Sequence, residues 1–477
     1  MAALWRRCGV TAPRGFFVRP LAREPVGACV VARTDQVKDS RYRKVPSARL
    51  SRLASFGQMA GGVAGGMLAE GVRRLASGER PRLSDLLLTP GNAMRVTDQL
   101  SRLRGAAMKL GQMISMDAGD ILPGELTAIL ARLRDTAHFM PPAQLNRVLA
   151  SEWGADWRGQ FAHFEATPIA AASIGQVHRA ALPDGQVVAV KVQYPGVARS
   201  IDADVDNVAS LLRMSGMLPH RLDIAPPLEE AKRQLHEEAD YIREAQQMRR
   251  YRTMLAGDPA FIVPFPVDAL SRKQVLVMEF VPGEPIEALQ AAPQAIRDRT
   301  MAALLGLVLR ELFEFGYMQT DPNFANYRWQ ADTGRIVLLD FGAARAVPSH
   351  TIEAYSRLLH AGLQSDQDAV IAALIEVGFI SAATLQRHRR VIDDMVSLTL
   401  KHAGRAGQFD FADRSFVGPL LQHSETIFAD RGAWHVPPAD TLFVQRKISG
   451  TALLAIRLQA RMPLRDMVTA VLNRTET

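Results

Sequence analysis

The spacing of apolar residues predicts helices first and strands immediately after them. From residue 97, the segment TDQLSRLRGAAMKLGQMI places leucine and alanine at intervals of three and four residues, which is typical of an amphipathic helix. A second helix is expected at 124–134, and a third after Pro141 and Pro142, because proline suits the first turn of a helix. Between residues 161 and 194, short β-branched runs separated by turn residues, among them an alanine-rich turn, predict antiparallel strands.

The rest of the chain is predicted to be mostly helical, with a few strands. Residues 197–254 have a helical pattern, and strands are expected again at 261–267 (FIVPFPV) and 274–281 (QVLVMEFV). A helix at 295–315, a last strand at 335–341 (RIVLLDF) and further helices complete the chain. Strands first and helices later indicate an α+β protein with a β-rich small lobe and a helical large lobe.

Positive charge is concentrated at the start of the chain. Residues 1–52 hold 12 of the 57 Lys and Arg residues and 3 of the 49 Asp and Glu residues, which leaves a nearly neutral body with 45 basic and 46 acidic residues. A nucleic-acid-binding body is therefore not expected. Both cysteines, Cys8 and Cys29, lie in this arm, so we expect a body without disulfides in a reducing compartment. We interpret the arm as a disordered basic tail; a transit peptide is the alternative, since residues 1–23 contain five Arg and no acid.

No segment is predicted to span a membrane. Apolar stretches such as 301–309 end at charged residues well before the roughly 20 apolar residues that a spanning helix needs. The run FGQMAGGVAGGMLAEG contains small residues at a spacing that lets helices approach closely, but outside a long apolar span it favours a linker or an ordinary helix. Peripheral membrane contact and a homodimer are left open.

These patterns divide the chain into five parts, the last two of which are the lobes. The parts are the basic arm at 1–52, a glycine-containing helical or linker region at 53–95, a helical extension at 96–150, the small lobe at 151–282 and the helical large lobe at 283–477.

Two polar motifs in the second half of the chain point to phosphate chemistry. QTDPNFAN holds Asp321 and Asn326 five residues apart, and Asp340 follows fourteen residues later in a D-F-G triplet. This order matches the kinase pattern, in which a catalytic-loop Asp orients the attacking group while an Asn and the DFG Asp hold Mg²⁺. Mg²⁺ needs more oxygen ligands than ATP supplies. We therefore predict that Asp321 is catalytic and that Asn326 and Asp340 bind Mg²⁺.

Upstream motifs fit the same pattern. Lys191 ends the strand-like segment VAVK and is predicted to reach the α and β phosphates of ATP, with Glu244 on a following helix as its partner. The segment LVMEFVPGEP is interpreted as the hinge between the lobes. Met278 would lie at the back of the adenine site, and backbone groups from Glu279 to Val281 would contact adenine.

Together these motifs resemble the UbiB family of atypical kinases, which includes AarF-like bacterial proteins and mitochondrial ubiquinone-biosynthesis members. KLGQ (109–112) resembles the family's KxGQ motif, and AAASIGQVH (170–178) resembles the alanine-rich loop that replaces a glycine-rich one. EADYIREA (238–245) contains an ExD pair, and QTDPNFAN lacks the His-Arg of ordinary kinases, as the family does. The resemblance covers about residues 55–470 and implies a protein-kinase-like bilobal fold with an N-terminal helical KxGQ extension.

The resemblance also implies further site residues. Lys109 and Gln112 would lie on a helix packed over the active site, with the ExD carboxylates of Glu238 and Asp240 nearby; pairing of Lys109 with one of them is a hypothesis. Alanine is largely barred from positive φ, so an alanine-rich loop over the nucleotide would be stiffer than a glycine-rich one. The residues implied in this loop are Ala170, Ala171, Ala172, Ser173, Ile174, Gly175 and Gln176.

The implied function is that of an ATPase or unorthodox small-molecule kinase that uses Mg²⁺-ATP in support of ubiquinone biosynthesis. Isoprenoid quinone precursors and quinone-biosynthesis enzymes are the implied partners. The alternative is a catalytically silent pseudokinase scaffold. An aminoglycoside-type or choline-type phosphotransferase is disfavoured, since those enzymes generally have a His before the catalytic Asp, and a protein serine kinase is disfavoured because no A-P-E segment follows Asp340. We expect a bacterial cytoplasmic location at the inner membrane, or the mitochondrial matrix if the arm is cleaved.

Overall fold

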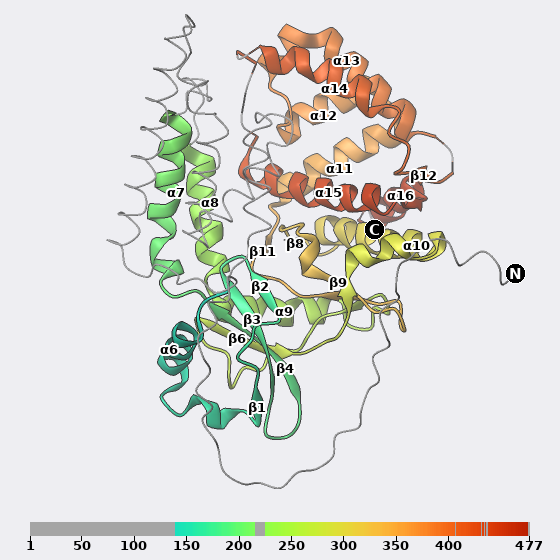
Figure 1. Ribbon diagram of the computed structural model, residues 1–477. Coiled ribbons are helices and arrows are strands. Elements are labelled where there is room, and N and C mark those ends of the chain that lie inside the picture. The colour runs from blue at the N-terminus through green and yellow to red at the C-terminus, as the bar shows by residue number, and fades with distance from the viewer. Residues whose placement is uncertain are drawn as a thin grey trace, which may run out of the picture. The chain divides into compact units, whose positions relative to one another are not determined.

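The computed structural model describes residues 139–214, 225–405, 407–430, 432–433, 435 and 437–475, and the structural statements below concern these residues (Figure 1). The predicted basic arm, the glycine-containing region, the helices expected from residue 97 and at 124–134, and the KxGQ motif lie outside them. The longest strands lie in the first part of the described chain together with several helices, and the last part is mostly helical, so the predicted α+β class is confirmed.

The small lobe is built on a five-stranded antiparallel sheet with the strand order β1-β3-β4-β6, in which β2 also pairs with β3. β3 and β4 form the longest hairpin, and its turn places Gly185 at a φ of 90°, which suits the predicted Asp-Gly turn. The strands are β1 (His163–Phe164), β2 (Ala170–Ala172), β3 (Gly175–Ala181), β4 (Val187–Gln193) and β6 (Val275–Glu279).

The alanine-rich segment is a strand, so the predicted turn at this position is wrong. Ala170–Ala172 pairs with β3 in register, from Ala170 opposite Val177 to Ala172 opposite Gly175. The chain reverses over Ser173 and Ile174 instead. Alanine is a weak strand former by itself, and here the partner strand supplies the ladder that determines its conformation.

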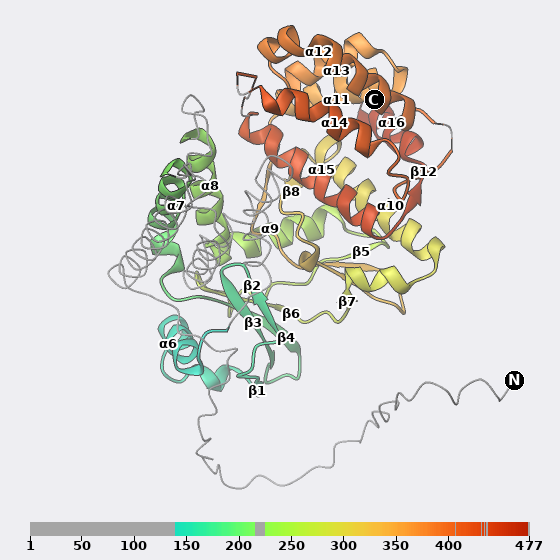
Figure 2. The same cartoon turned by 45° about the horizontal axis from the view of Figure 1, so that its top comes forward.

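Helices surround this sheet. The helix expected after the two prolines begins at Pro142 without a side-chain cap, and the predicted helical stretch from 197 consists of three helices. Figures 1 and 2 show α7 and α8 lying side by side, with α9 next to the sheet. The helices are α6 (Pro142–Trp153), the 3₁₀ helix η1 (Trp157–Gln160), α7 (Val197–Met214), α8 (Ala225–Glu238) and α9 (Tyr241–Met254).

The large lobe is a helical body with small sheets at its base. The predicted strand FIVPFPV is reduced to Phe261–Ile262, because Pro264 and Pro266 lack the amide that continued pairing requires. The strands are β5 (Phe261–Ile262), β7 (Glu284–Pro285), β8 (Tyr317–Gln319), β9 (Tyr327–Trp329), β10 (Ile336–Leu338), β11 (Ala344–Ala346), β12 (Phe409–Asp410) and β13 (Arg461–Met462). The helices are η2 (Ile286–Ala291), α10 (Gln294–Phe313), η3 (Phe324–Asn326), α11 (Ser349–Gln364), α12 (Gln367–Val377), α13 (Ala382–Ala403), α14 (Val417–Ala429), α15 (Ala439–Arg457) and α16 (Leu464–Thr475).

The core explains why β4 has an almost unbroken apolar sequence. Val188, Val190 and Val192 are fully buried on one face of the strand. The opposite face carries Ala189, Lys191 and Gln193, so a lysine occupies a strand position that is 6% exposed. Such a charge must be paired to be stable there.

Among the described helices, none combines the length and the apolar character that crossing a bilayer requires.

Candidate active site

The predicted phosphate-binding lysine lies between two carboxylates from distant parts of the chain. Lys191 Nζ donates to both oxygens of Glu244, at 2.9 and 3.0 Å, and to Asp340 Oδ2 at 3.0 Å. The side chains of Lys191 and Glu244 are 7% and 0% exposed, whereas that of Asp340 is 26% exposed. The strand β4, the helix α9 and the D-F-G segment therefore meet at this lysine.

Burial and charge together set the ionisation of this cluster. Burial raises the pKa of Glu244 to about 7, while the neighbouring Lys191 counteracts the rise. Burial alone would lower the pKa of Lys191, but the carboxylates of Asp340 and Glu244 raise it well above its ordinary value. Lys191 is thus held as a cation, which is the form that would contact phosphate oxygens.

The start of α9 positions Glu244. Asp240 caps this helix, and its Oδ1 accepts from the amides of Ile242 and Arg243 at 3.1 and 3.2 Å. Glu244 lies in the first turn, where the helix dipole favours a carboxylate. The structure therefore gives the second ExD carboxylate a capping role, in addition to the gating role that the sequence suggested.

Gln319 connects the predicted catalytic loop to the D-F-G segment. Its side-chain oxygen accepts from the amide of Asp321 at 2.9 Å, and its side-chain nitrogen donates to the carbonyl of Asp340 at 3.1 Å. Asn326 Nδ2 lies 3.3 Å from Asp321 Oδ2. This role of Gln319 was not predicted from the sequence, although its place directly before Thr320 and Asp321 was a usable signal.

The residues predicted to bind Mg²⁺ face one small cavity. Asn326 and Asp340 both line it, together with Gln319. Among the described residues, no three His, Cys, Asp or Glu side chains form a metal-binding group on their own. An amide oxygen and a carboxylate fit Mg²⁺ whose other ligands are phosphate oxygens and water, which is its usual coordination at nucleotide sites.

Glu238, the first ExD carboxylate, lies beside the D-F-G segment. A Cβ added to Gly342 would be 3.4 Å from Glu238 Cγ and 3.4 Å from Asp340 Oδ1. Glu238 itself is 6% exposed. Lys109 and Gln112, the other implied residues of this gate, lie outside the described residues, so their pairing with Glu238 or Asp240 stays a hypothesis.

The residues implied in the alanine-rich loop face different surroundings. Ala171 is exposed, Ala170, Ala172 and Ser173 are half-buried, and Ile174 is buried. Gln176 is fully buried, and its side chain accepts from the amide of Met140 at 2.7 Å and contacts His178 Nε2 at 2.9 Å. The Gln176 side chain therefore makes its hydrogen bonds inside the small lobe.

Gly175 is explained by packing. A Cβ at this position would lie 2.4 Å from the carbonyl oxygen of Val192 and 3.0 Å from the hydroxyl of Tyr241. Any other residue would push β3 away from β4, the strand that carries Lys191.

The predicted hinge is partly occupied by protein contacts. Met278 is buried and lies opposite Ala189 of β4. The amide of Glu279 donates to the carbonyl of Phe265 at 2.8 Å, and its carboxylate accepts from the amide of Phe265 at 3.2 Å. The amide of Phe280 donates to Val187. Adenine contacts through the Glu279 carbonyl and Val281 remain a prediction.

Two arginines fix the segment after the D-F-G triplet. Arg243 of α9 donates to the carbonyls of Gly342 and Ala344, both at 2.7 Å. Arg345 donates to Glu230 at 2.6 Å and to Glu237 at 2.8 Å, both on α8. Neither arginine was singled out from the sequence, because these contacts join residues about 100 positions apart.

Replacing Arg345 with Ala is expected to destabilise the protein by about 2 kcal/mol, because two partly buried carboxylates lose a buried charged donor that they share. The matched control is Arg233→Ala. Arg233 pairs with the same Glu230 and Glu237 but is 55% exposed, so its loss should cost about 0.5 kcal/mol or less. Urea unfolding of both variants measures the difference in the free energy of unfolding. Equal losses of stability would contradict the larger contribution expected of Arg345.

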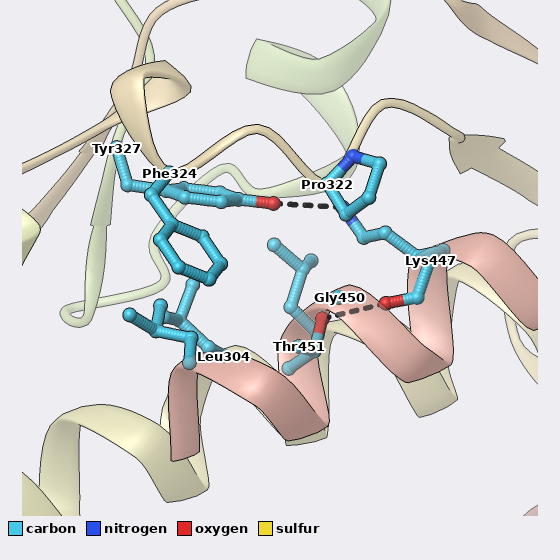
Figure 3. Close-up of a pocket in the computed structure, with 9 residues that line it drawn as sticks. Leu304, Pro322, Phe324, Tyr327, Lys447, Gly450 and Thr451 are labelled. Atoms are coloured by element: carbon cyan, nitrogen blue, oxygen red, sulfur yellow. Dashed lines mark hydrogen bonds between the residues drawn. The ribbon is translucent and has the colours of Figure 1, made fainter. Parts of the chain in front are cut away.

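Helix α15 lies directly under the predicted catalytic loop. Figure 3 shows a small apolar pocket here, with Pro322 and Phe324 on one side and Gly450 and Thr451 of α15 on the other. A Cβ on Gly450 would be 2.3 Å from Pro322 Cβ. A glycine within a helix is normally unfavourable, so here it serves the close approach of helix and loop.

Replacing Gly450 with Ala is therefore expected to destabilise the protein by about 1–3 kcal/mol, although alanine favours helices, because the methyl group overlaps a rigid proline ring. Gly306 of α10 is the control, since a Cβ there would only touch the end of Met467 at 3.9 Å, so Gly306→Ala should be neutral or stabilising. Thermal unfolding compares the two. A stabilised Gly450→Ala variant would contradict this prediction, because the loop at Pro322 would then move to accommodate the methyl group without cost.

Comparison with known proteins decides the family. The family model described as "ABC1 atypical kinase-like domain" matches residues 132–374. The chain is also 37% identical over 445 residues to "Atypical kinase COQ8B, mitochondrial" of Danio rerio, with 91% of this chain and 70% of that protein covered. This chain belongs to the ABC1 family of atypical kinases. The predicted resemblance to the UbiB family, whose ubiquinone-biosynthesis members are of the COQ8 type, is thereby confirmed.

Further ABC1-family relatives agree. "Atypical kinase COQ8, mitochondrial" of Saccharomyces cerevisiae is 36% identical over 429 residues, with 89% of this chain and 85% of that protein covered. A solved structure of Rv3197 with erythromycin, from Mycobacterium tuberculosis, is 27% identical with a TM-score of 0.55, and the match covers 80% of this chain and 95% of that chain. The kinase-like bilobal fold predicted from the motifs is confirmed for this ABC1-family member.

Proposed function

We propose that this ABC1-family chain uses Mg²⁺-ATP as an ATPase or small-molecule kinase in support of ubiquinone biosynthesis. The observation that carries the proposal is the contact of Lys191 with both Glu244 and Asp340, next to a cavity lined by Asn326 and Asp340. Phosphoryl transfer depends mainly on positioning and charge stabilisation, and this arrangement supplies a cation and two oxygen ligands.

Each group has a specific part in the proposed mechanism. Lys191 would hold the α and β phosphates, and Asn326 and Asp340 would hold Mg²⁺, which neutralises phosphate charge when bound. Asp321, whose carboxylate lies beside the Asn326 amide, would orient the attacking hydroxyl or water and accept its proton. Gln319 would hold the loop and the D-F-G segment at a fixed position relative to each other through its two hydrogen bonds.

The proposed substrates determine the proposed location. Isoprenoid quinone precursors are lipid-like, so the protein would work in peripheral contact with a membrane, where the basic arm meets anionic lipid. The relatives from Danio rerio and Saccharomyces cerevisiae are named as mitochondrial. We therefore propose a membrane-facing position in the mitochondrial matrix or, for a bacterial source, at the inner face of the cytoplasmic membrane.

A quinone profile of cells that lack the protein tests the proposal. Wild type should restore the normal quinone content, and Asp340→Asn should leave it low, because turnover would require the Asp340 carboxylate. Both proteins must be present at equal amounts, which immunoblotting establishes. Full rescue by Asp340→Asn would instead support the alternative of a catalytically silent scaffold for quinone-biosynthesis enzymes.

A further inference from the structure

A buried ion pair lies beneath the catalytic loop, and the mechanism proposed above gives it no role. Lys447 of α15 and Glu311 of α10 are 2% and 1% exposed. Their Nζ and Oε2 atoms are 3.5 Å apart. Both residues line the small cavity that Asn326 and Asp340 also line, so the pair is adjacent to the two residues proposed to hold Mg²⁺.

The two charges contact both ends of the loop. Glu311 Oε1 accepts from the amide of Gln319, where the loop begins, at 3.2 Å. Lys447 Nζ donates to the hydroxyl of Tyr327, which directly follows the loop, at 3.0 Å (Figure 3). Asp321 and Asn326 lie between these two anchors in the sequence.

The same pair also reaches the helix that carries the partner of Lys191. Tyr251 of α9 donates its hydroxyl hydrogen to Glu311 Oε1 at 2.7 Å. Tyr251 is fully buried and lies 4.8 Å from the ring of Phe341 in the D-F-G segment, measured between ring centroids. One carboxylate thus connects α9, the D-F-G segment and the start of the catalytic loop.

Stability alone does not account for charges at this depth. A buried ion pair loses its hydration, and replacing such a pair with apolar side chains of similar volume is often neutral or stabilising. Burial raises the pKa of Glu311, and Lys447 counteracts this rise. The pair instead positions its neighbours, since charged hydrogen bonds hold their partners in a defined geometry.

We propose that Lys447 and Glu311 are positioning residues for phosphoryl transfer, which hold Asp321 and Asn326 in place by anchoring the loop at Gln319 and Tyr327. Neither residue touches the nucleotide; both act through the loop. This inference rests on the proposed Mg²⁺-ATP function. It adds α15, a helix outside the usual nucleotide-binding elements, to the machinery that determines the rate.

The test uses the full chain with three variants: Lys447→Met, Lys447→Met/Glu311→Gln, and Tyr327→Phe. Lys447→Met should lower kcat for ATP by about 10- to 100-fold, since small displacements of reacting groups have effects of this size, while the Kd for ADP stays within about threefold. The double variant carries no buried charge at these two positions, so its Tm should recover toward wild type while its kcat stays low. Recovery of kcat together with Tm would overturn the proposal, because the pair would then be only structural.

Tyr327→Phe provides a milder test if the lysine variants fail to fold. It removes only the hydroxyl that accepts from Lys447, and we expect kcat to fall by about 5- to 10-fold without a change in ADP binding. Tyr355→Phe is the matched control. Tyr355 is also buried, and its hydroxyl bonds the carbonyl of Thr441 away from the loop, so kcat should be unchanged. Equal kcat values for the two variants would contradict the proposal.

Hydrogen exchange separates this inference from the proposed function. Amides in the peptide 319–327 should exchange about tenfold faster in Tyr327→Phe than in wild type and in Tyr355→Phe, because the loop loses one anchor. This measurement needs no turnover. If wild type hydrolyses no ATP, the proposed function fails, and unchanged exchange in Tyr327→Phe overturns the positioning role independently.

Discussion

Asp340→Asn should lower the rate of ATP hydrolysis by about 100-fold or more, since it removes a charge that would hold Mg²⁺ and that pairs with Lys191 at 3.0 Å. The fold should persist, because asparagine keeps the side-chain oxygen that accepts from the amide of Gly342 at 3.0 Å. Phosphate release in the presence of Mg²⁺-ATP and liposomes measures the effect.

A matched variant controls for the loss of one carboxylate. Asp332 is exposed in the turn between β9 and β10, and its carboxylate only accepts from the amide of Thr333. Asp332→Asn should therefore hydrolyse ATP at the wild-type rate. If Asp340→Asn also keeps the wild-type rate while its Tm is unchanged, Asp340 does not hold the metal and the proposed mechanism is wrong.

Lys191→Met should destabilise the protein strongly, by about 3 kcal/mol or more above neutral pH. The change leaves the fully buried Glu244 carboxylate next to Asp340 without a cation. It should also abolish ATP turnover, because the proposed contact of Lys191 with the phosphates is lost. Urea unfolding midpoints give the first effect, and phosphate release gives the second.

The loss of stability should depend on pH in a defined direction. Burial raises the folded-state pKa of Glu244 from 4.5 to about 7, so this group favours the folded state at low pH, and the benefit is lost as pH rises through that interval. Without Lys191 the pKa of Glu244 rises further. The difference between Lys191→Met and wild type should therefore be small near pH 5 and large near pH 8.

Two variants make this result decisive. Lys191→Met/Glu244→Gln has no carboxylate to titrate at this position, so its stability difference from wild type should vary less with pH. Lys273→Met removes an exposed lysine from the same lobe and should behave as wild type. A pH-independent loss in Lys191→Met would show that lost packing, rather than the unpaired Glu244, causes the instability.

Site residues that belong to short motifs with a fixed spacing could be predicted from the sequence. Lys191, Asn326 and Asp340 belong to local patterns whose chemistry requires particular side chains, and the structure brings Lys191 to Asp340 and places Asn326 and Asp340 on one cavity. The α+β order followed equally from local periodicity. Predictions of this kind need no knowledge of which distant segments meet.

The remaining features depend on tertiary contacts. Lys447 and Glu311 lie in helices whose apolar pattern gives no sign that one charge meets another inside. Ala170–Ala172 contains no strand-forming residue, and its pairing with β3 determines its conformation. Conversely, the strand expected at 261–267 is short because its two prolines outweigh its apolar residues.

The two hydrogen bonds from Arg243 to the backbone of Gly342 and Ala344 have a consequence for inhibitors. They tie the helix that carries Glu244 to the segment that carries Asp340, so neither can swing outward without breaking both bonds or taking the other along. Compounds that require a displaced D-F-G segment would have to overcome this link, whereas compounds confined to the space of the nucleotide would not. Inhibitors of this protein should therefore be designed for the conformation described here, in which Arg243 holds α9 and the D-F-G segment together.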